Sequence, residues 1–205
     1  MKSVSRLFIF TLAACLIVGC APKPVKTIEN LKAAYNGEST ASAKYAAFAE
    51  KAKAEGFDTV AVMFLATSKA EAIHAGNHLK VLEKLGEKIT GPEIGKFEVL
   101  STAENIADGI KGETYELETM YPDLIATAKM EKSSGAVKSF TWAFDTEKKH
   151  QIFYKTALAV VATGGEKSLP AKWFVCPVCG NTFNEAGVPA KCDFCMTPKE
   201  KFIEF

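Results

Sequence analysis

The chain has 205 residues, of which 48% are hydrophobic and 24% are charged, and its formal net charge is +1. This composition excludes a wholly disordered or collagen-like chain, and the near-neutral charge argues against a nucleic-acid-binding surface. The six cysteines fall into two groups with none between Cys20 and Cys176. That distribution disfavours a scaffold held together by disulfides spread along the chain.

Residues 1–19 have the organisation of a secretory signal. Lys2 and Arg6 precede a run of thirteen almost wholly apolar residues, Leu7–Gly19, whereas a membrane-spanning helix needs about 20. The run ends in Leu-Ile-Val-Gly-Cys20, which resembles a bacterial lipobox and predicts cleavage before Cys20 with lipid attached to its thiol. An ordinary secretory signal or an uncleaved anchor is the alternative.

Cleavage would remove Cys15, Lys2 and Arg6, so 23 basic residues would face 24 acidic ones and the net charge would be −1. Residues 20–26 then read as a short tether. We expect a protein of the cell envelope, lipid-anchored to a bacterial membrane on its extracytoplasmic or periplasmic face. The N-terminus has no twin arginine, which predicts the general secretory route.

Four helices are predicted between Thr27 and about Lys167, because apolar residues recur there at spacings of three and four. The first begins with Thr27 as its cap and ends at Gly56. The second covers about 58–85 and precedes a loop with Gly91, Pro92 and Gly95.

Ser101 and Glu104 have the spacing of a capping box and predict the start of a third helix. We expect Pro122 to kink this helix and Gly135 to end it. The fourth helix is predicted over about 136–163, before Gly164.

The two helix pairs share polar landmarks. Gly37-Glu38 is echoed by Gly112-Glu113, and Glu71-x-x-His74 by Glu147-x-x-His150. The separations from the first glutamate to the second are 33 and 34 positions. This repeat predicts a duplicated hairpin that places the landmark residues opposite one another in the bundle core.

A Glu-x-x-His on each of two helices, with one glutamate from each of the other two, is the ligand set of dinuclear carboxylate sites in helical bundles. Carboxylates can bridge two metals, and imidazole completes the coordination without adding charge. Glu116, three residues after Glu113, is either an alternative ligand or an exposed glutamate. For His78 we favour a supporting or surface role over ligation.

The C-terminal segment carries Cys176-x-x-Cys179 and Cys192-x-x-Cys195, two knuckles that together enclose one metal ion. The ligands alone leave iron and zinc open: iron would carry one electron, and zinc would make a structural or binding module. We expect the nearby aromatic residues to pack around the metal rather than recognise bases; they are Trp173, Phe174, Phe183, Phe194 and Phe202.

From Thr27 to Phe205 the chain resembles the rubrerythrin family. The resemblance rests on Gly37-Glu38, Tyr45, Glu55-Gly56-Phe57, Glu71-x-x-His74, Gly112-Glu113-x-Tyr115-Glu116, Met120-Tyr121-Pro122, Glu147-x-x-His150 and the two knuckles in that order. It implies a mainly α fold, with a ferritin-like four-helix bundle over 27–167 and a rubredoxin-like four-cysteine module over 168–205.

The resemblance also implies a role for each ligand. Glu71 and Glu147 would bridge two irons. Glu38 would hold one iron, on which Glu116 and His74 exchange with redox state, and Glu113 and His150 would hold the other. Tyr45 and Tyr121 would hydrogen-bond ligand carboxylates. A third iron, for which zinc could substitute, would sit among Cys176, Cys179, Cys192 and Cys195.

Two features depart from the family pattern. Its usual cytoplasmic member has no lipobox, and the second knuckle here reads Cys-Asp193-Phe194-Cys, without the proline common at its second position.

The implied activity is reduction of hydrogen peroxide to water, with electrons from an unknown donor passing through the thiolate-bound iron. A ferroxidase or oxygen-reducing, iron-handling protein is one alternative. A non-enzymatic electron carrier or zinc-ribbon interaction module is another. By analogy with the family we expect a homodimer in which a neighbouring subunit supplies the nearest four-cysteine centre.

Overall fold

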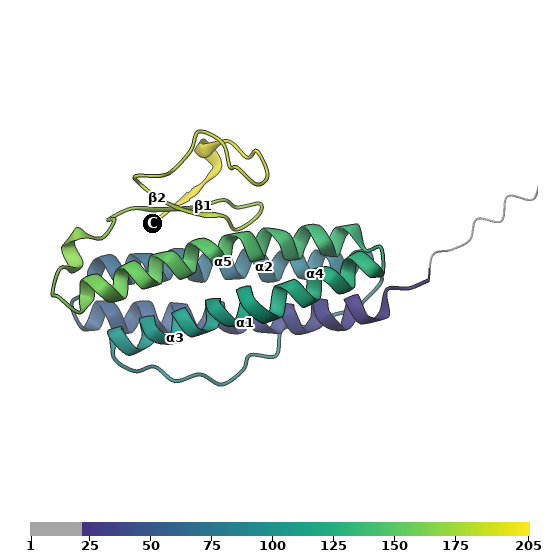
Figure 1. The fold of residues 1–205 in the computed structure, drawn as a ribbon, viewed down its shortest axis with the longest axis horizontal. Helices are drawn as coiled ribbons and strands as arrows, with labels where there is room; N and C mark the ends of the chain where they lie inside the picture. Colours follow the sequence, from purple (N-terminus) through teal and green to yellow (C-terminus); the bar gives the residue numbers. More distant parts are fainter. Residues whose placement is uncertain (1–21) are drawn as a thin grey trace, which may run out of the picture.

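The computed structural model of the chain describes residues 22–205, so the predicted signal segment 1–19 and Cys20 lie outside the described residues. Long helices lie side by side in a bundle, and a small β module covers one face of it (Figure 1). The helical elements are α1 (Val25–Ala54), α2 (Asp58–Lys84), α3 (Thr102–Tyr115), the π-helix η1 (Glu116–Met120), α4 (Tyr121–Met130) and α5 (Ser134–Val161).

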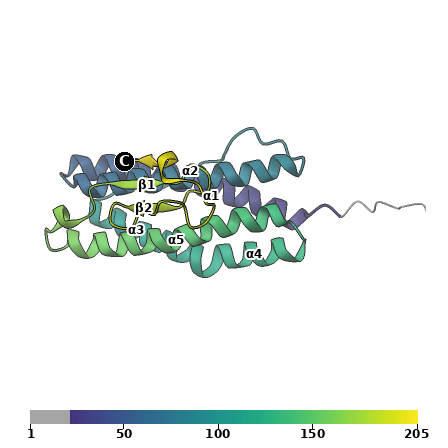
Figure 2. The ribbon, with the colours of Figure 1, turned by 90° about the horizontal axis from the view of Figure 1, so that it is seen from above.

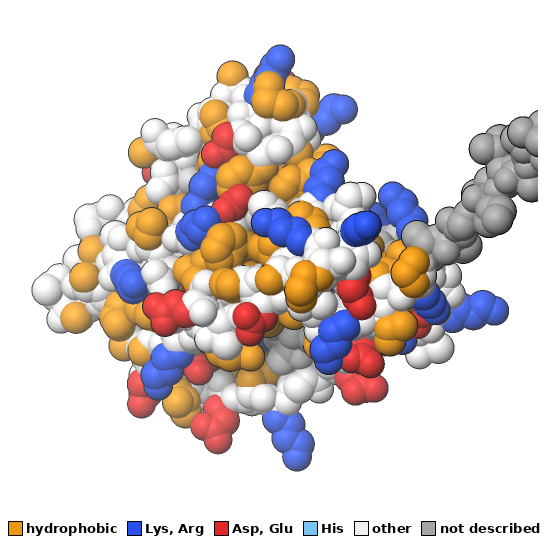
Figure 3. Space-filling view, turned by 45° about the vertical axis from the view of Figure 1, so that its right-hand side comes forward, with side chains coloured by type: hydrophobic (Ala, Val, Ile, Leu, Met, Phe, Trp, Pro, Cys, Tyr) orange, Lys and Arg blue, Asp and Glu red, His pale blue; other side chains and the backbone are white. Residues whose placement is uncertain are grey.

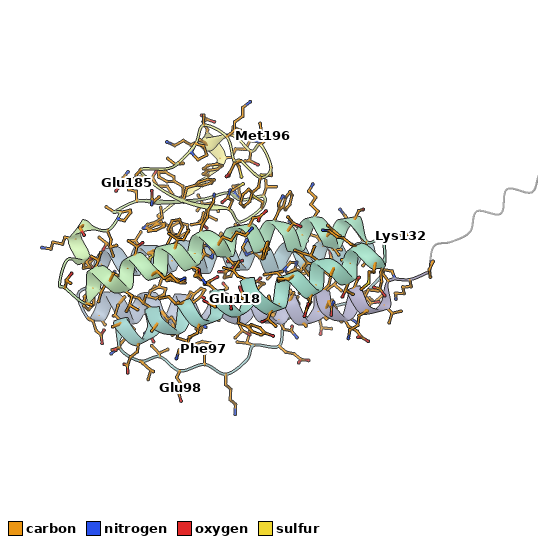
Figure 4. All side chains as sticks on the ribbon, in the orientation of Figure 1. Phe97, Glu98, Glu118, Lys132, Glu185 and Met196 are labelled. Carbon is orange, nitrogen blue, oxygen red and sulfur yellow. The ribbon has the colours of Figure 1, made fainter. Side chains whose placement is uncertain are left out.

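The bundle has the connectivity of a ferritin-like fold. Short turns join α1 to α2 and α4 to α5, and a long irregular segment, residues 85–101, joins α2 to α3. This segment runs along the lower edge of the bundle in Figure 1, and Phe97 and Glu98 mark it in Figure 4. The crossover lets α1 pack on α2 while α5 packs on α2, α3 and α4. Within residues 22–205 no helix is long and apolar enough to cross a membrane.

Carboxylates from distant segments cap three helices. Glu131 accepts hydrogen bonds from the backbone N–H groups of Lys26 and Thr27 in the first turn of α1. Glu55 does the same for Thr102 at the start of α3. The prediction that Thr27 caps the first helix was therefore wrong: α1 begins at Val25 after Pro24, and the anion that its N-terminus requires comes from the far end of α4.

Glu166 caps α2 from the segment that leads to the β module. Its Oε1 accepts hydrogen bonds from the backbone N–H of Thr59 at 2.7 Å and from the hydroxyl of Thr59. We expect Glu166→Ala to lower the free energy of unfolding by about 1 kcal/mol, since a lost N-terminal cap costs that much. Lys167→Ala, in the same 3-10 turn, is the control. Equal midpoints for the two variants in urea unfolding would contradict this role.

The third predicted helix has a different course. α3 passes through the π-helix η1 into α4, where Pro122 occupies the first turn and the N–H of Tyr121 reaches the carbonyl of Glu116. The helix ends at Met130, before Lys132, which has φ +56°, and the N–H of Ser133 bonds the carbonyl of Ala128. This is a Schellman ending with lysine in the place usually taken by glycine. The prediction that Gly135 ends this helix was wrong, because Gly135 lies inside α5. The capping box at Ser101 and Glu104 is confirmed.

The bundle core is divided into two apolar clusters. One gathers Tyr45, Phe48, Phe64 and Tyr154 with smaller residues. The other gathers Leu31, Leu82, Tyr121 and Phe140. The acidic and histidine landmarks of the sequence repeat lie on the same helices, between the residues of these clusters. Apolar packing on both sides holds the helix backbones that position the polar side chains.

The β module follows the 3-10 turn η2 (Glu166–Ser168) and lies over α2 and α5 (Figure 2). Its sheet has the order β2-β1-β3, with both pairings antiparallel; the strands are β1 (Trp173–Val175), β2 (Thr182–Asn184) and β3 (Ile203–Glu204), and the 3-10 turn η3 (Lys199–Lys201) precedes β3. Trp173 packs edge-on against Phe153 of α5, with ring centroids 4.7 Å apart. The aromatic residues Phe174 and Phe183 pack with three of the cysteines, as predicted. The prediction that Trp173 packs around the metal was wrong, because its ring belongs to the apolar cluster of the bundle.

Candidate metal centres

The sequence repeat brings its landmark residues together in the middle of the bundle. Four helices contribute side chains to this centre, and all six side chains are buried. They are Glu38 from α1, Glu71 and His74 from α2, Glu113 from α3, and Glu147 and His150 from α5. Glu and His three positions apart project from one helix face, so each Glu-x-x-His pair reaches the same centre. The predicted convergence of these six residues is confirmed.

The six side chains form two overlapping groups. Glu38, Glu71, His74 and Glu147 make one, and Glu71, Glu113, Glu147 and His150 make the other, with the possible ligand atoms of each group within 4.8 Å of one another. Glu71 and Glu147 belong to both. Nδ1 of His150 lies 2.7 Å from one oxygen of Glu147, and Nδ1 of His74 lies 3.0 Å from the other. Two shared carboxylates between two groups is the arrangement of a dinuclear site.

The buried polar atoms of this centre fit metal ions. Apart from the cluster's own histidines, both oxygens of Glu147 and one oxygen each of Glu38, Glu71 and Glu113 have no hydrogen-bond partner among the described residues. An unpartnered buried carboxylate oxygen is costly, and several together repel one another. Divalent cations with carboxylate and imidazole ligands satisfy these atoms and neutralise the charge.

The ionisation of the cluster reflects this crowding. Burial, together with the neighbouring carboxylates, raises the pKa of Glu38 and of Glu113 well above the usual range. Burial opposes protonation of His74 and His150, but Glu71 and Glu147 outweigh it and raise their pKa values to about 10 and about 9. The cluster therefore favours binding of positive charge, either as protons or as metal ions.

These shifts predict how the metal-free chain responds to pH. A raised histidine pKa contributes stability that is complete below the ordinary value of 6.5 and is lost as the pH rises through about 9 to 10. The raised glutamate pKa values act in the same direction above pH 4.5. We expect thermal unfolding of the chelated chain to occur at a lower temperature at pH 9 than at pH 6.5.

Added Zn²⁺ or Fe²⁺ should reverse this trend, because the ligands bind metal in their deprotonated forms and affinity rises with pH. A melting temperature of the chelated chain that stays constant or increases from pH 6.5 to pH 9 would contradict the assignment of a charged, buried cluster.

Glu116 lies beside the cluster but belongs to neither group of four. It begins the π-helix η1 and is partly buried. Burial and the carboxylates of Glu147 and Glu71 raise its pKa well above the usual range. The structure therefore groups His74 with Glu38 and places Glu116 adjacent to them. Glu116 begins a π-helix, and π-helical turns are often found at functional sites.

A directed chain of hydrogen bonds supports one side of the centre. The Tyr121 hydroxyl donates to Glu38. His78 Nε2 lies 3.2 Å from the Tyr121 oxygen, and its Nδ1 lies 2.8 Å from the hydroxyl of Ser139. Burial and the neighbouring His74 lower the pKa of His78 to about 3, so this imidazole is neutral. His78 thus supports Tyr121 instead of joining either metal group, as favoured from the sequence, and it is not a surface residue.

The other side has a matching tyrosine and one that the sequence analysis missed. Tyr45 donates to Glu113 at 2.7 Å. Tyr154 packs edge-on against Tyr45 and hydrogen-bonds Thr67 at 2.7 Å. Gly109 faces Tyr154 so closely that an added Cβ would lie 2.9 Å from its ring. Tyr154 follows His150 by four positions, a spacing that puts both on one helix face and that could have identified it.

The four cysteines of the module converge as predicted. Cys176, Cys179, Cys192 and Cys195 are free thiols whose sulfur atoms lie within 4.8 Å of one another, and three of them are buried. The sulfurs of Cys176 and Cys195 are 3.4 Å apart, as are those of Cys179 and Cys192. Four convergent sulfurs without a disulfide fit one tetrahedral ion.

The module contacts the outer edges of both cluster histidines. His150 Nε2 lies 2.9 Å from the hydroxyl of Thr182, which donates to the carbonyl of Gly180. The Thr182 oxygen therefore accepts the His150 Nε2 proton and leaves Nδ1 free toward the carboxylates. Gly180 lies against His74, where an added Cβ would be 2.3 Å from Nε2. These contacts come from the same chain, at the place where a neighbouring subunit's module was expected.

Comparison with known proteins agrees with this geometry. The sequence model of the family described as rubrerythrin matches residues 29–158. The chain is 35% identical to nigerythrin of Nitratidesulfovibrio vulgaris (strain Hildenborough), covering 87% of this chain and 86% of that protein. It is 30% identical to rubrerythrin-2 of Clostridium acetobutylicum, covering 89% of this chain and 98% of that protein.

Solved structures show the same fold. The fully reduced, all-ferrous state of nigerythrin superposes with a TM-score of 0.79 at 34% identity, covering 87% of this chain and 86% of that one. A bacterioferritin of Desulfovibrio desulfuricans superposes with a TM-score of 0.66 at 18% identity, covering 81% of this chain and 96% of that one. The latter similarity supports the fold alone.

Proposed function

Because the chain belongs to the rubrerythrin family, we propose that it reduces hydrogen peroxide to water. The buried glutamate and histidine cluster is its di-iron site, and the four cysteines form its rubredoxin-like iron site. We propose Glu38, Glu71, His74, Glu113, Glu116, Glu147 and His150 as di-iron ligands, with Glu71 and Glu147 shared. Helical residues 27–167 and residues 168–205 form the two proposed domains.

When bound, two irons would supply two electrons together, so that H₂O₂, two protons and two electrons give two water molecules without release of a hydroxyl radical. The protein holds the acidic ligands in fixed positions through Tyr45 on Glu113 and Tyr121 on Glu38. Burial and the neighbouring carboxylates raise the pKa of Glu38 and of Glu113 well above the usual range, so these side chains favour a bound cation, either a proton or a metal ion. Aromatic clusters on both sides exclude water from the centre.

One observation carries the proposal: the four-cysteine module packs directly on the histidines of the cluster. Thr182 and Gly180 lie between the cysteine knuckle and the bundle and contact His150 and His74. An enzyme that must be rereduced after each turnover needs such a route, whereas iron storage does not. This contact favours peroxide reduction over a ferroxidase role.

The experiment is an anaerobic titration of the fully reduced, iron-loaded chain with peroxide, after counting its iron. We expect three irons per chain and consumption of one peroxide for every two electrons, counting the electron of the four-cysteine iron as well as the two of the di-iron site. A chain that holds three irons but leaves peroxide unconsumed would overturn the proposal. Zinc in the four-cysteine site would remove the electron path and leave the module structural.

We further propose that Cys20 carries lipid and anchors the protein at the extracytoplasmic face of a bacterial membrane. The sequence around Cys20 supports this, and the described chain begins at one end of the bundle, away from the module (Figure 1). A Cys20→Ser variant should leave the membrane fraction. Recovery of that variant in the membrane fraction would contradict the anchor.

A homodimer remains a proposal by analogy with the family. Sedimentation of the iron-loaded chain tests it, with a single species of twice the chain mass as the expected result. Since the chain's own module contacts the cluster, the electron path proposed here does not require a second subunit.

A further inference from the structure

Lys149 belongs to the bundle, but its ammonium group makes its contacts in the module. It lies on α5 between Glu147 and His150. Its Nζ donates to Oδ1 of Asn181 at 2.7 Å and lies 4.3 Å from the ring centroid of Phe183. The amide of Asn77 on α2 makes a second link, to the carbonyl of Val178 at 2.9 Å, but that link carries no formal charge.

Asn181 connects this lysine to the cysteine cluster. It is fully buried, and its amide nitrogen donates to the sulfur of Cys192 at 3.6 Å and to the carboxylate of Asp193. Lys149 Nζ also lies 3.5 Å from that carboxylate. Lys149 of the bundle is therefore linked to the metal-ligating sulfur of Cys192 through a single side chain, that of Asn181. Asp193 stands where the family commonly has proline, so the sequence departure noted above lies within this contact.

The charge of the module depends on the ion that it holds. Four thiolates give a net charge of −2 with a divalent ion and −1 with a trivalent ion. The carboxylate of Asp193 adds to that negative charge on the module side. Lysines gather on the bundle surface below the module (Figure 3), and Lys80 and Lys138 border the groove beside Pro177 and Val178. Among the described lysines of the bundle, Lys149 is the one hydrogen-bonded to the module.

We propose that Lys149 makes the docking of the module on the bundle depend on the charge of the four-cysteine site, with tighter docking around a divalent ion than around a trivalent one. The Coulomb attraction between the ammonium and the thiolate cluster is larger when the cluster carries one more negative charge. By linkage, docking must then favour reduction of the iron site. The docked module therefore has the higher reduction potential, and this increase corresponds to the same free energy by which reduction tightens docking. In turnover, which rests on the proposed function, the module that carries an electron is held on His74 and His150 and loosens after the electron leaves.

Zn²⁺ and Ga³⁺ test this without any redox reaction, because both take four thiolates and differ by one charge. The readout is trypsin cleavage of the native chain after Lys167, identified by fragment mass. Glu166 and Leu169 on either side of Lys167 are buried against the helices, so cleavage requires the linker to open and its rate follows the open fraction. We expect the Ga³⁺-loaded chain to be cut about fivefold faster than the Zn²⁺-loaded chain.

Lys149→Met keeps the stem that covers Phe183 and removes the charge. We expect it to reduce the ratio of the two cleavage rates to about one, and to lower the reduction potential of the iron-loaded site in a dye titration by the matching factor. Lys149→Arg should retain most of the ratio. Lys155→Met is the matched control, because Lys155 bonds Gln151 on α5.

Equal rates for the two ions in the unaltered chain would overturn the proposal, as would a ratio that persists in Lys149→Met. A variant with an altered ratio and an unchanged potential would also contradict it, since the linkage requires both. Because neither ion reduces peroxide, these results are independent of whether the peroxidase assignment holds.

Discussion

Glu147→Gln should abolish the di-iron site while leaving the four-cysteine site intact. Glu147 is fully buried, belongs to both groups of metal ligands and contacts both cluster histidines through its two oxygens. Glutamine has the same size but cannot bridge two cations as an anion. We expect the iron content to fall from three per chain to one and peroxide reduction to fall by more than about a hundredfold, the upper end of what loss of an outer hydrogen-bond partner costs.

The matched control is Glu118→Gln, an exposed glutamate on η1 that is labelled in Figure 4. It should keep three irons and full activity. In Glu147→Gln the red colour of the Fe(III)–thiolate site reports that the module has folded. Full activity or three irons in Glu147→Gln would show that the cluster is not the catalytic centre.

Gly180→Ala should separate the two metal centres functionally. Gly180 has φ +83°, which alanine adopts at a cost of about 1–2 kcal/mol, and the added methyl would lie 2.3 Å from Nε2 of His74. His74 is buried and its ring is held by Glu71 and Glu147, so we expect the module to relieve this clash by moving away from the bundle. We therefore expect a chain that holds three irons but rereduces its di-iron site at least about tenfold more slowly, since electron transfer weakens with distance.

Gly187→Ala in the same module is the control, because an added Cβ there meets only Asn184 at 3.8 Å. Should Gly180→Ala lose the four-cysteine iron, Thr182→Val provides a milder change that removes the hydrogen bond to His150. Unchanged rereduction in both variants would contradict a path through this contact.

Mixing two impaired chains tests whether the contact acts within one chain. Glu147→Gln retains a working module, and Gly180→Ala retains a working di-iron site. If electrons pass within one chain, the mixture stays as slow as Gly180→Ala alone. If modules serve neighbouring subunits, the Glu147→Gln module restores activity to the other chain.

The cluster itself could be predicted from the sequence because it depends on local periodicity. Glu71 with His74, and Glu147 with His150, lie three positions apart on helices whose apolar residues define the buried face. The repeat in the two halves then predicts that both pairs meet. The spacing of the four cysteines, two Cys-x-x-Cys pairs, likewise predicts that their sulfurs converge on one tetrahedral metal ion.

Other features depend on contacts between segments far apart in the chain. Glu131 and Glu166 cap helices that begin over one hundred positions earlier, and no local pattern indicates such a partner. The third predicted helix ends at Met130 because the backbone enters the left-handed region at Lys132, although Gly135 is the residue that favours this region intrinsically. The π-helical turn that begins at Glu116 lies just before Pro122, which has no N–H to donate to the helix.

The docking of the module was beyond the sequence for the same reason. Gly180 reads as a glycine of a cysteine knuckle, and its second role against His74 exists only when module and bundle are packed together. Lys149 reads as an exposed helix lysine beside a metal ligand, and its contact with Asn181 again arises from the packing. Residues at such an interface must satisfy both their own element and the element packed against it, and a local sequence pattern indicates only the first of these requirements.

The central claim is that electrons pass from the four-cysteine iron to a peroxide-reducing di-iron site, and anaerobic stopped-flow mixing of the fully reduced chain tests it most directly. Peroxide and oxygen are mixed separately, and the Fe(III)–thiolate colour is followed. We predict that the colour develops rapidly with peroxide and slowly with oxygen, and that it slows in Gly180→Ala. Faster colour with oxygen, or none with peroxide while iron fills both sites, would contradict the account.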